Sequence, residues 1–249
     1  MYTTNYSPET AYQLEDGKIA AFEYDHSPSS PRRDWDNLGF LALKSHAGDE
    51  GCPYELGLLV AYSQGYTPEE AAEASYVEAD VAEVKSAFAE FKRELAIVLP
   101  VYRYEHSAVA YNTTGFNDRW DSGQAGVIYA TKAAVRQCYG VKRITDGVLE
   151  KAKSCLVGEV ETFSQWANGD VYGIKLYADQ EAYEKGEEED SCWGFYFSEG
   201  YDFDKAVADH FRSEIVESER YTPPLRQPSP QEVYQERLNA FLESLEEVA

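Results

Sequence analysis

Residues 97–131, IVLPVYRYEHSAVAYNTTGFNDRWDSGQAGVIYAT, form the stretch that decides the fold. Three short runs within it, 97–104, 108–112 and 126–131, are rich in β-branched residues and tyrosines. Residues typical of turns separate the runs. This composition predicts three β-strands, because branched and aromatic side chains pack well on a pleated surface.

Helices are predicted on both sides of these strands. On the N-terminal side, Thr67-Pro68-Glu69-Glu70 combines an N-cap, a proline at the first helical position and a carboxylate for a capping box. The apolar positions that follow recur every three or four residues up to residue 95, which predicts one helix face. On the C-terminal side, helices are predicted at 131–139 and 145–169, each with a threonine at its start and a glycine at its end.

The outer segments add further strands. Residues 19–24 and 38–46 each contain a short apolar run, and residues 171–178 and 191–197 are predicted to form a hairpin around an acidic loop, 179–190. Strands and helices mix here without a regular βαβ alternation, so the sequence predicts an α+β fold. We expect a central, mainly antiparallel sheet with packed helices.

The last part of the chain differs in composition from the rest. A helix is predicted over 202–217, then a stiff proline-rich connector at 222–230, then a final capped helix from Ser229. We therefore expect a core domain of residues 1–200 and an acidic helical extension of residues 201–249. Two interpretations of the final helix stay open: it packs back on the core, or it forms a surface for a partner.

The charge of the chain is strongly negative, with 45 acidic against 22 basic residues and a formal net charge of −23. Such a surplus repels phosphates and anionic lipids, which argues against direct binding of nucleic acid or membrane. No apolar stretch approaches the ~18 residues of a membrane span. The N-terminal sequence has no signal-peptide pattern, so we expect the protein in the cytoplasm of the cell that makes it.

More than half of the charge belongs to residues 179–249, which hold 19 acids and 6 bases. The densest run is Glu187, Glu188, Glu189 and Asp190. One interpretation is solvated surface charge that keeps the protein soluble. The other is a row of carboxylates that imitates nucleic-acid phosphates and occupies a basic groove of a partner protein.

Cysteines and histidines give no sign of a cofactor or metal. The four cysteines have no CxxC spacing, and the four histidines are scattered, so we expect reduced thiols, no metal site and no cofactor. The residue types needed for catalysis are nevertheless present. His106 supplies a base, Asp121 a carboxylate to orient it, and Ser122 and Cys192 two nucleophiles, although no GxSxG elbow surrounds the serine.

Several segments combine Trp, Asp, Ser, Gly and His in ways that packing alone does not require. They are SPRRDWDNLG (30–39), LPVYRYEHS (99–107), WDSGQAGVIY (120–129), GEVETF (158–163), GDVYG (169–173) and DSCWGF (190–195). In this order they resemble a family of uncharacterised proteins of bacteriophages and related mobile elements, over roughly residues 27–197. The family tends to carry a Cys-x-His segment before a Gly-Asp, and residues 43–49 depart from that pattern by lacking the cysteine.

The resemblance implies a phage origin and a shared core, and it supplies no reaction. Our first hypothesis is an accessory protein that binds and inhibits or modulates a host or defence-system protein through its acidic surface. The alternatives are a small hydrolase or nucleotide-modifying enzyme built on His106, Asp121 and Cys192, and a ligand-binding module with an aromatic pocket. The residues expected to bind, besides the acidic run, are Trp35, Asp36, Asn37, Trp120, Gln124, Asp170, Tyr172 and Trp193.

Overall fold

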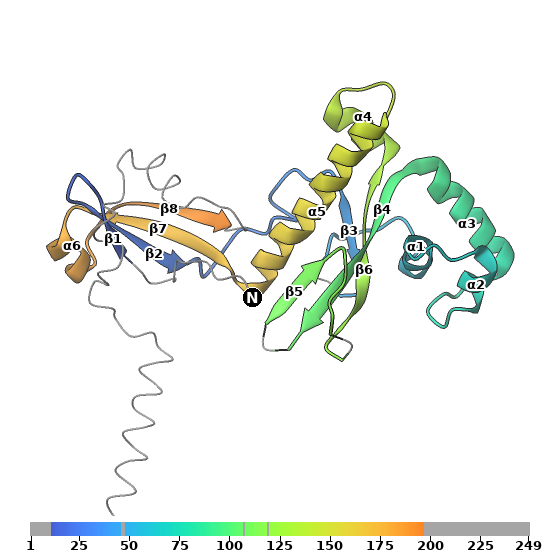
Figure 1. Ribbon diagram of the computed structural model, residues 1–249, viewed down its shortest axis with the longest axis horizontal. Coiled ribbons are helices and arrows are strands. Elements are labelled where there is room, and N and C mark those ends of the chain that lie inside the picture. The colour runs from blue at the N-terminus through green and yellow to red at the C-terminus, as the bar shows by residue number, and fades with distance from the viewer. Residues whose placement is uncertain (1–10, 46–47, 107, 119, 197–249) are drawn as a thin grey trace, which may run out of the picture. The chain divides into compact units, whose positions relative to one another are not determined.

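The computed structural model describes residues 11–45, 48–106, 108–118 and 120–196 (Figure 1). The predicted helices after residue 201 and the proline-rich connector lie outside the described residues. His46 also lies outside them. In the part of the chain that is described, no helix is both long and apolar enough to cross a membrane.

The chain divides into two compact units. The smaller unit consists of Met1–Asp25 and Tyr172–Ala249, and the larger unit is His26–Val171. The larger unit is therefore inserted into the smaller one in the order of the chain. The fold is α+β, but the single central sheet that the sequence predicts is wrong, since each unit has a four-stranded antiparallel sheet of its own.

The larger unit contains residues 97–131, for which three strands are predicted. Its sheet has the order β3 (Phe40–Leu43), β6 (Ser122–Thr131), β4 (Leu95–Glu105) and β5 (Val109–Asn112). All three strands predicted within 97–131 are present, and the observed β4 and β6 are longer than predicted. Antiparallel pairing runs along almost the whole length of β4 and β6.

Helices cover both faces of this sheet, as Figure 1 shows. On one face lie α4 (Lys132–Tyr139) and α5 (Asp146–Asn168), and on the other α1 (Leu56–Ser63), α2 (Pro68–Glu73) and α3 (Val81–Glu94). Strand β6 faces both layers, because alternate side chains of a strand point to opposite faces. Val127 and Tyr129 pack with α1–α3, whereas Ile128 and Ala130 pack with α4 and α5.

The single helix predicted from Thr67 to residue 95 is wrong, because α2 and α3 are separate helices. Thr67 caps α2 with the predicted capping box, and the chain then leaves the helix at Ala74. Asp80 begins α3 with a second capping box, in which its side chain accepts hydrogen bonds from the backbone N–H groups of Ala82 and Glu83. A carboxylate that satisfies the first free N–H groups stabilises a new helix start at this position.

The sheet of the smaller unit combines strands from two distant parts of the sequence. Its sheet has the order β1 (Ala11–Gln13), β2 (Ile19–Tyr24), β7 (Val171–Tyr177) and β8 (Glu188–Tyr196). The predicted acidic loop at 179–190 is also wrong. Residues Gln180–Lys185 form the short helix α6, and the acidic run enters strand β8 at Glu188.

Candidate functional site

Arg32 is the centre of a buried polar network that joins two of the motif segments, residues 30–39 and 158–163, to Asp49. Its Nε and Nη2 donate to the two carboxylate oxygens of Asp49, at 2.9 and 2.6 Å, and its Nη1 donates to Glu159 at 2.9 Å. The remaining donors reach Asn37 Oδ1 at 3.0 Å and the carbonyl of Gly39 at 2.7 Å. All five N–H donors of the guanidinium are used, so none is left for a ligand.

Both carboxylates of this network also accept backbone hydrogen bonds. Asp49 accepts from the N–H of Leu41 at 2.8 Å, and Glu159 accepts from the N–H groups of Leu38 and Gly39 at 2.7 and 3.2 Å. The side chains of Asp49 and Glu159 are only 15% and 11% exposed. Because one guanidinium neutralises only one of two carboxylates, these backbone dipoles offset the remaining negative charge.

The electrostatics of Arg32 follow from this arrangement. Burial on its own lowers the pKa of the guanidinium, but the hydrogen bonds and charges of Asp49 and Glu159 outweigh burial and raise the pKa above its ordinary value. Arg32 is thus a permanent cation. The thiol of Cys155, one helical turn before Glu159, has its pKa raised by burial and by the neighbouring carboxylate. That thiol is therefore a poor nucleophile at neutral pH.

The segment that carries Arg32 is itself fixed by local hydrogen bonds. The Asn37 amide donates to the carbonyls of Pro31 and Trp35, at 2.8 and 2.9 Å. The backbone N–H of buried Ser30 donates to Asp34 at 2.8 Å. Asn37, expected from the sequence to bind a partner, is instead held between Arg32 and its own loop. Trp35 and Asp36, also expected to bind, are exposed on the surface of this loop.

His106 and Asp121 are brought together at one end of the larger sheet. His106 Nδ1 lies 3.2 Å from Asp121 Oδ2, and the two side chains are 69% and 38% exposed. The adjacent turn is held by Asp118, whose carboxylate accepts from the N–H groups of Trp120 and Asp121 at 2.8 and 2.9 Å. These bonds lower the pKa of Asp118. Trp120 is almost entirely exposed.

The two candidate nucleophiles do not join this pair. The Ser122 hydroxyl donates to the backbone carbonyl of Asp118. Cys192 lies on β8 of the smaller unit, whereas His106, Asp121 and Ser122 belong to the larger unit. Among the described residues, which do not include Ser107, no serine or cysteine makes a hydrogen bond to His106.

Gln124 and Asp170 have structural partners. The Gln124 amide donates to the Ser63 hydroxyl at 3.0 Å and accepts from the Gln64 amide at 2.7 Å, which ties β6 to the end of α1. Asp170 accepts from the side chain of Asn168 at 2.6 Å, just after α5 ends. Hydrogen bonds of this kind explain why both positions are polar without requiring a ligand.

Tyr172 and Trp193 lie in the sheet of the smaller unit. A methyl group added to Gly173 would overlap the Trp193 ring, so the glycine of GDVYG makes room for the tryptophan of DSCWGF. Lys175 Nζ lies 5.7 Å from the centre of the same ring, a distance suited to a cation–π contact. Tyr172 stacks on Tyr24 with ring centres 5.1 Å apart. These two motifs therefore meet through packing between neighbouring strands.

The acidic run, Glu187–Asp190, which we call the acid strand, is exposed along its length. Glu188 lies 3.5 Å from Lys175 Nζ, and Glu189 lies 2.7 Å from Lys18 Nζ. The hydrogen bond that Lys18 donates to Glu189 is the main cause that raises the pKa of Lys18. The described residues of the smaller unit hold eleven acids against three bases, so the two lysines neutralise only part of this surface.

Metal binding finds no support in this part of the chain. Over residues 11–45, 48–106, 108–118 and 120–196, no group of three or more His, Cys, Asp or Glu side chains is placed to hold a metal ion. The carboxylate of Asp49 is already bound to Arg32.

One feature that sequence reasoning missed is a local reversal of charge. Residues 132–153, which we call the basic corner, contain six lysines and arginines but only two acids. They cover α4, the following turn and the first turns of α5. A charge count in a short window along the chain reveals this segment, whereas the net charge of the whole chain conceals it.

Comparisons of the chain with protein-family models, curated proteins and solved structures found no match. The resemblance of the six motifs to phage proteins therefore stays an expectation.

Proposed function

We propose that this protein is a phage-encoded accessory protein of the host cytoplasm that binds and inhibits or modulates a host or defence-system protein. The acidic surface of the smaller unit carries the contact and imitates nucleic-acid phosphates. The observation that supports this proposal is the position of Glu188–Asp190 at the start of β8, directly after Glu187, where consecutive exposed carboxylates are held by a strand. The phage origin rests on the motif resemblance.

Strand geometry makes these carboxylates suitable mimics. Alternate residues of a strand lie about 7 Å apart on one face, and the phosphates of one nucleic-acid strand follow one another every ~3.4 Å along the helix axis. Two phosphate steps therefore cover about the same distance as two alternate carboxylates of the strand. A basic groove that binds every second phosphate can bind these carboxylates at the same spacing. Among the described strands, β8 is also the last in the sheet order, and an edge strand can pair with a partner.

The alternatives have weaker support. An enzyme built on His106 needs a nucleophile or an activated water beside it, and the Ser122 hydroxyl is used by a backbone carbonyl. A ligand-binding module needs a pocket lined by the motif aromatics. Within the described residues, a hollow of about 160 Å³ is lined by Tyr62, Ser63 and residues 95–98, none of which is among the predicted binding residues.

We further propose that the predicted acidic helical extension, residues 201–249, enlarges the same surface, since it adds eleven acids and only five bases. Deletion of residues 221–249 should then weaken partner binding. If the truncated protein binds the partner as strongly as the full chain, the extension has no part in the contact.

Capture from bacterial host lysate tests the proposed function. The wild-type protein, tagged and immobilised at about 50 mM salt, should retain a specific protein that is released as the salt rises, because exposed charge pairs are screened. A variant with Glu187, Glu188, Glu189→Gln and Asp190→Asn should retain much less of it.

A matched variant controls for the change in net charge. Glu50, Glu73, Glu78 and Glu90 are exposed acids of the larger unit with no ion pair among the described residues. Their replacement by glutamine changes the net charge equally and should leave capture unchanged. Equal capture by the wild type and the acid-strand variant would refute the proposal.

A further inference from the structure

We infer that the basic corner, residues 132–153, binds the phosphodiester backbone of a nucleic acid. This inference does not rest on the proposed function, because it concerns different residues in the other unit. It also departs from what the net charge of −23 predicts, and the physical reason for that difference is the local distribution of charge.

Charge is strongly segregated within the larger unit. The basic corner has six bases and two acids, whereas the rest of residues 26–171 has eight bases and nineteen acids. At physiological salt, exposed charges further away than a Debye length of about 8 Å are largely screened. A phosphate at the corner therefore experiences mainly the local positive charge.

Five of the six cations of the corner are exposed. The exposed lysines and arginines are Arg136, Lys142, Arg143, Lys151 and Lys153. None of the five forms an ion pair within the described part of the chain, although acids are plentiful in the sequence. In contrast, seven other bases, among them Lys18, Lys85 and Lys185, are ion-paired.

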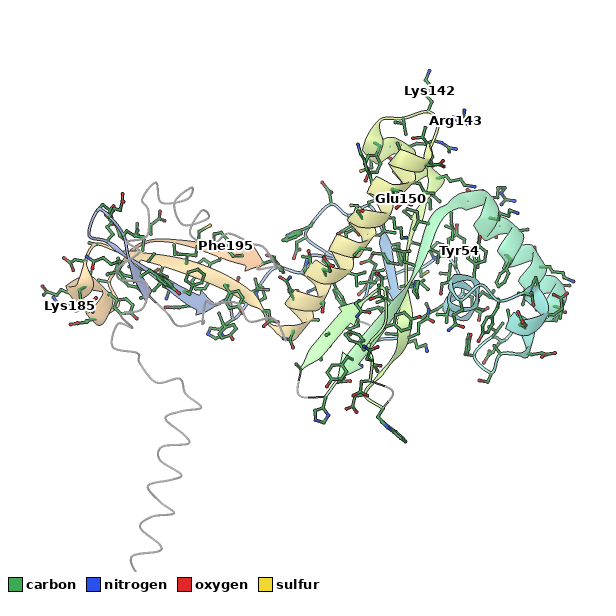
Figure 2. The ribbon with its side chains drawn as sticks, in the orientation of Figure 1. Tyr54, Lys142, Arg143, Glu150, Lys185 and Phe195 are labelled. Carbon is green, nitrogen blue, oxygen red and sulfur yellow. The ribbon has the colours of Figure 1, made fainter. Side chains whose placement is uncertain are left out.

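The turn that presents these side chains is well defined. Gly140 ends α4 in the left-handed conformation, with φ of 62°, and the N–H of Val141 donates to the Arg136 carbonyl at 3.0 Å. Thr145 then caps α5 through the N–H of Val148. In Figure 2, Lys142 and Arg143 extend from this turn away from the ribbon. Phosphate contacts gain from such fixed placement, since less side-chain and loop freedom is lost on binding.

Lys132 links the corner to the end of α3. Its Nζ donates to the carbonyls of Lys92 and Arg93, at 2.7 and 3.0 Å, which are among the last carbonyls of that helix. A cation at a helix C-terminus is favourable because the free carbonyls there are partially negative. Lys132 thus ties the end of α3 to the start of α4.

A nucleic acid fits this surface better than an acidic protein does. The central residues of protein interfaces are typically large aromatic or apolar side chains. The exposed large apolar residues of the described chain are Trp35, Tyr66, Tyr76, Val81, Trp120 and Trp193, and none lies in the corner. A surface of unpaired lysines and arginines without an apolar anchor is suited to the sequence-independent recognition of phosphates.

Fluorescence anisotropy tests this inference with the full-length protein and labelled 20-nucleotide single- and double-stranded DNA. At about 50 mM salt we expect a dissociation constant of about 10⁻⁴ M or tighter, and a steep loss of affinity as salt rises. The variant with Arg136, Lys142 and Arg143→Gln should bind at least tenfold more weakly. Its log–log salt slope should be smaller by about 2 to 3, since each lost phosphate contact removes about 0.9.

A matched variant with Arg33, Lys85 and Lys185→Gln removes the same charge from other exposed positions and should bind DNA nearly as the wild type does. Polyglutamate of similar length serves as the acidic-protein probe. The inference is overturned if the wild type binds neither DNA, if both triple variants lose affinity equally, or if polyglutamate binds as tightly as DNA.

Discussion

The Arg32 network gives the sharpest prediction for stability. The Arg32 side chain is only 3% exposed. Replacing Arg32 by methionine keeps most of the apolar part of this side chain but removes the guanidinium. Two largely buried carboxylates, Asp49 and Glu159, are then left without a cation. Breaking a buried ion pair from one side costs about 3–5 kcal/mol. That is a large part of the roughly 5–15 kcal/mol by which a folded domain is stable.

Urea unfolding, followed by tryptophan fluorescence, measures this loss. Trp35, Trp120 and Trp166 belong to the larger unit, so they report its unfolding. With a slope of about 2 kcal/mol per molar urea, the midpoint of Arg32→Met should fall by about 1.5–2.5 M. Arg33→Met, at an exposed neighbouring position, should change the free energy of unfolding by less than about 0.5 kcal/mol.

A double variant separates lost charge from lost packing. Glu159→Gln alone should destabilise by about 1–3 kcal/mol, because one amide oxygen cannot serve both Arg32 and the N–H of Leu38. In the Arg32→Met background the same change should cost less or stabilise, since it removes one of two unpaired charges. If Arg32→Met unfolds at the midpoint of the wild type, the network does not hold the fold and our reading of the motifs is wrong.

Three further changes test other parts of the fold. Gly173→Ala should destabilise the smaller unit, because the added methyl overlaps Trp193. Trp193→Leu in the same chain should restore much of the lost stability. If the thermal unfolding of Gly173→Ala is the same as that of the wild type, the contact is contradicted. Asp80→Ala should cost about 1 kcal/mol in urea unfolding, as expected for an N-cap, whereas no change would mean that α3 does not depend on its cap. Iodoacetamide near pH 7.5 should label exposed Cys138 well before Cys155, whose thiol pKa is raised by burial and a carboxylate; mass spectrometry that finds Cys155 labelled first would contradict its placement.

Features that depend on neighbouring residues were predictable from the sequence. The helix at 146–168 and the short helix before it begin at a threonine cap and end at a glycine with positive φ, as expected. The separate start of α3 also had a local signal, because Asp80 and Glu83 have the spacing of a capping box. The apolar residues continue at helical spacing across this point, and for that reason the sequence pattern predicts one continuous helix. Local chemistry sets these boundaries, because capping groups act within one turn.

Features that depend on distant residues were not predictable. Strand β2 pairs with β7, so that Ile19 lies opposite Tyr177, and no local pattern encodes a partner so far along the chain. The polar motif around Arg32 was recognisable as unusual, but its explanation lies in Asp49 and Glu159, 17 and 127 residues away. In the sequence alone, a polar residue of a buried charged network looks the same as a residue that binds a ligand. Only the positions of its partners in the structure distinguish the two.

The most direct test of the proposed function is the salt dependence of binding to the protein that the wild type captures. Its dissociation constant should be measured from about 50 to 300 mM salt for three proteins: the wild type, the acid-strand variant, and the matched variant altered at Glu50, Glu73, Glu78 and Glu90. We predict that the wild type and the matched variant lose affinity steeply and alike as salt rises. The acid-strand variant should bind more weakly and with a shallower slope. Equal affinities and slopes for the wild type and the acid-strand variant would contradict the account.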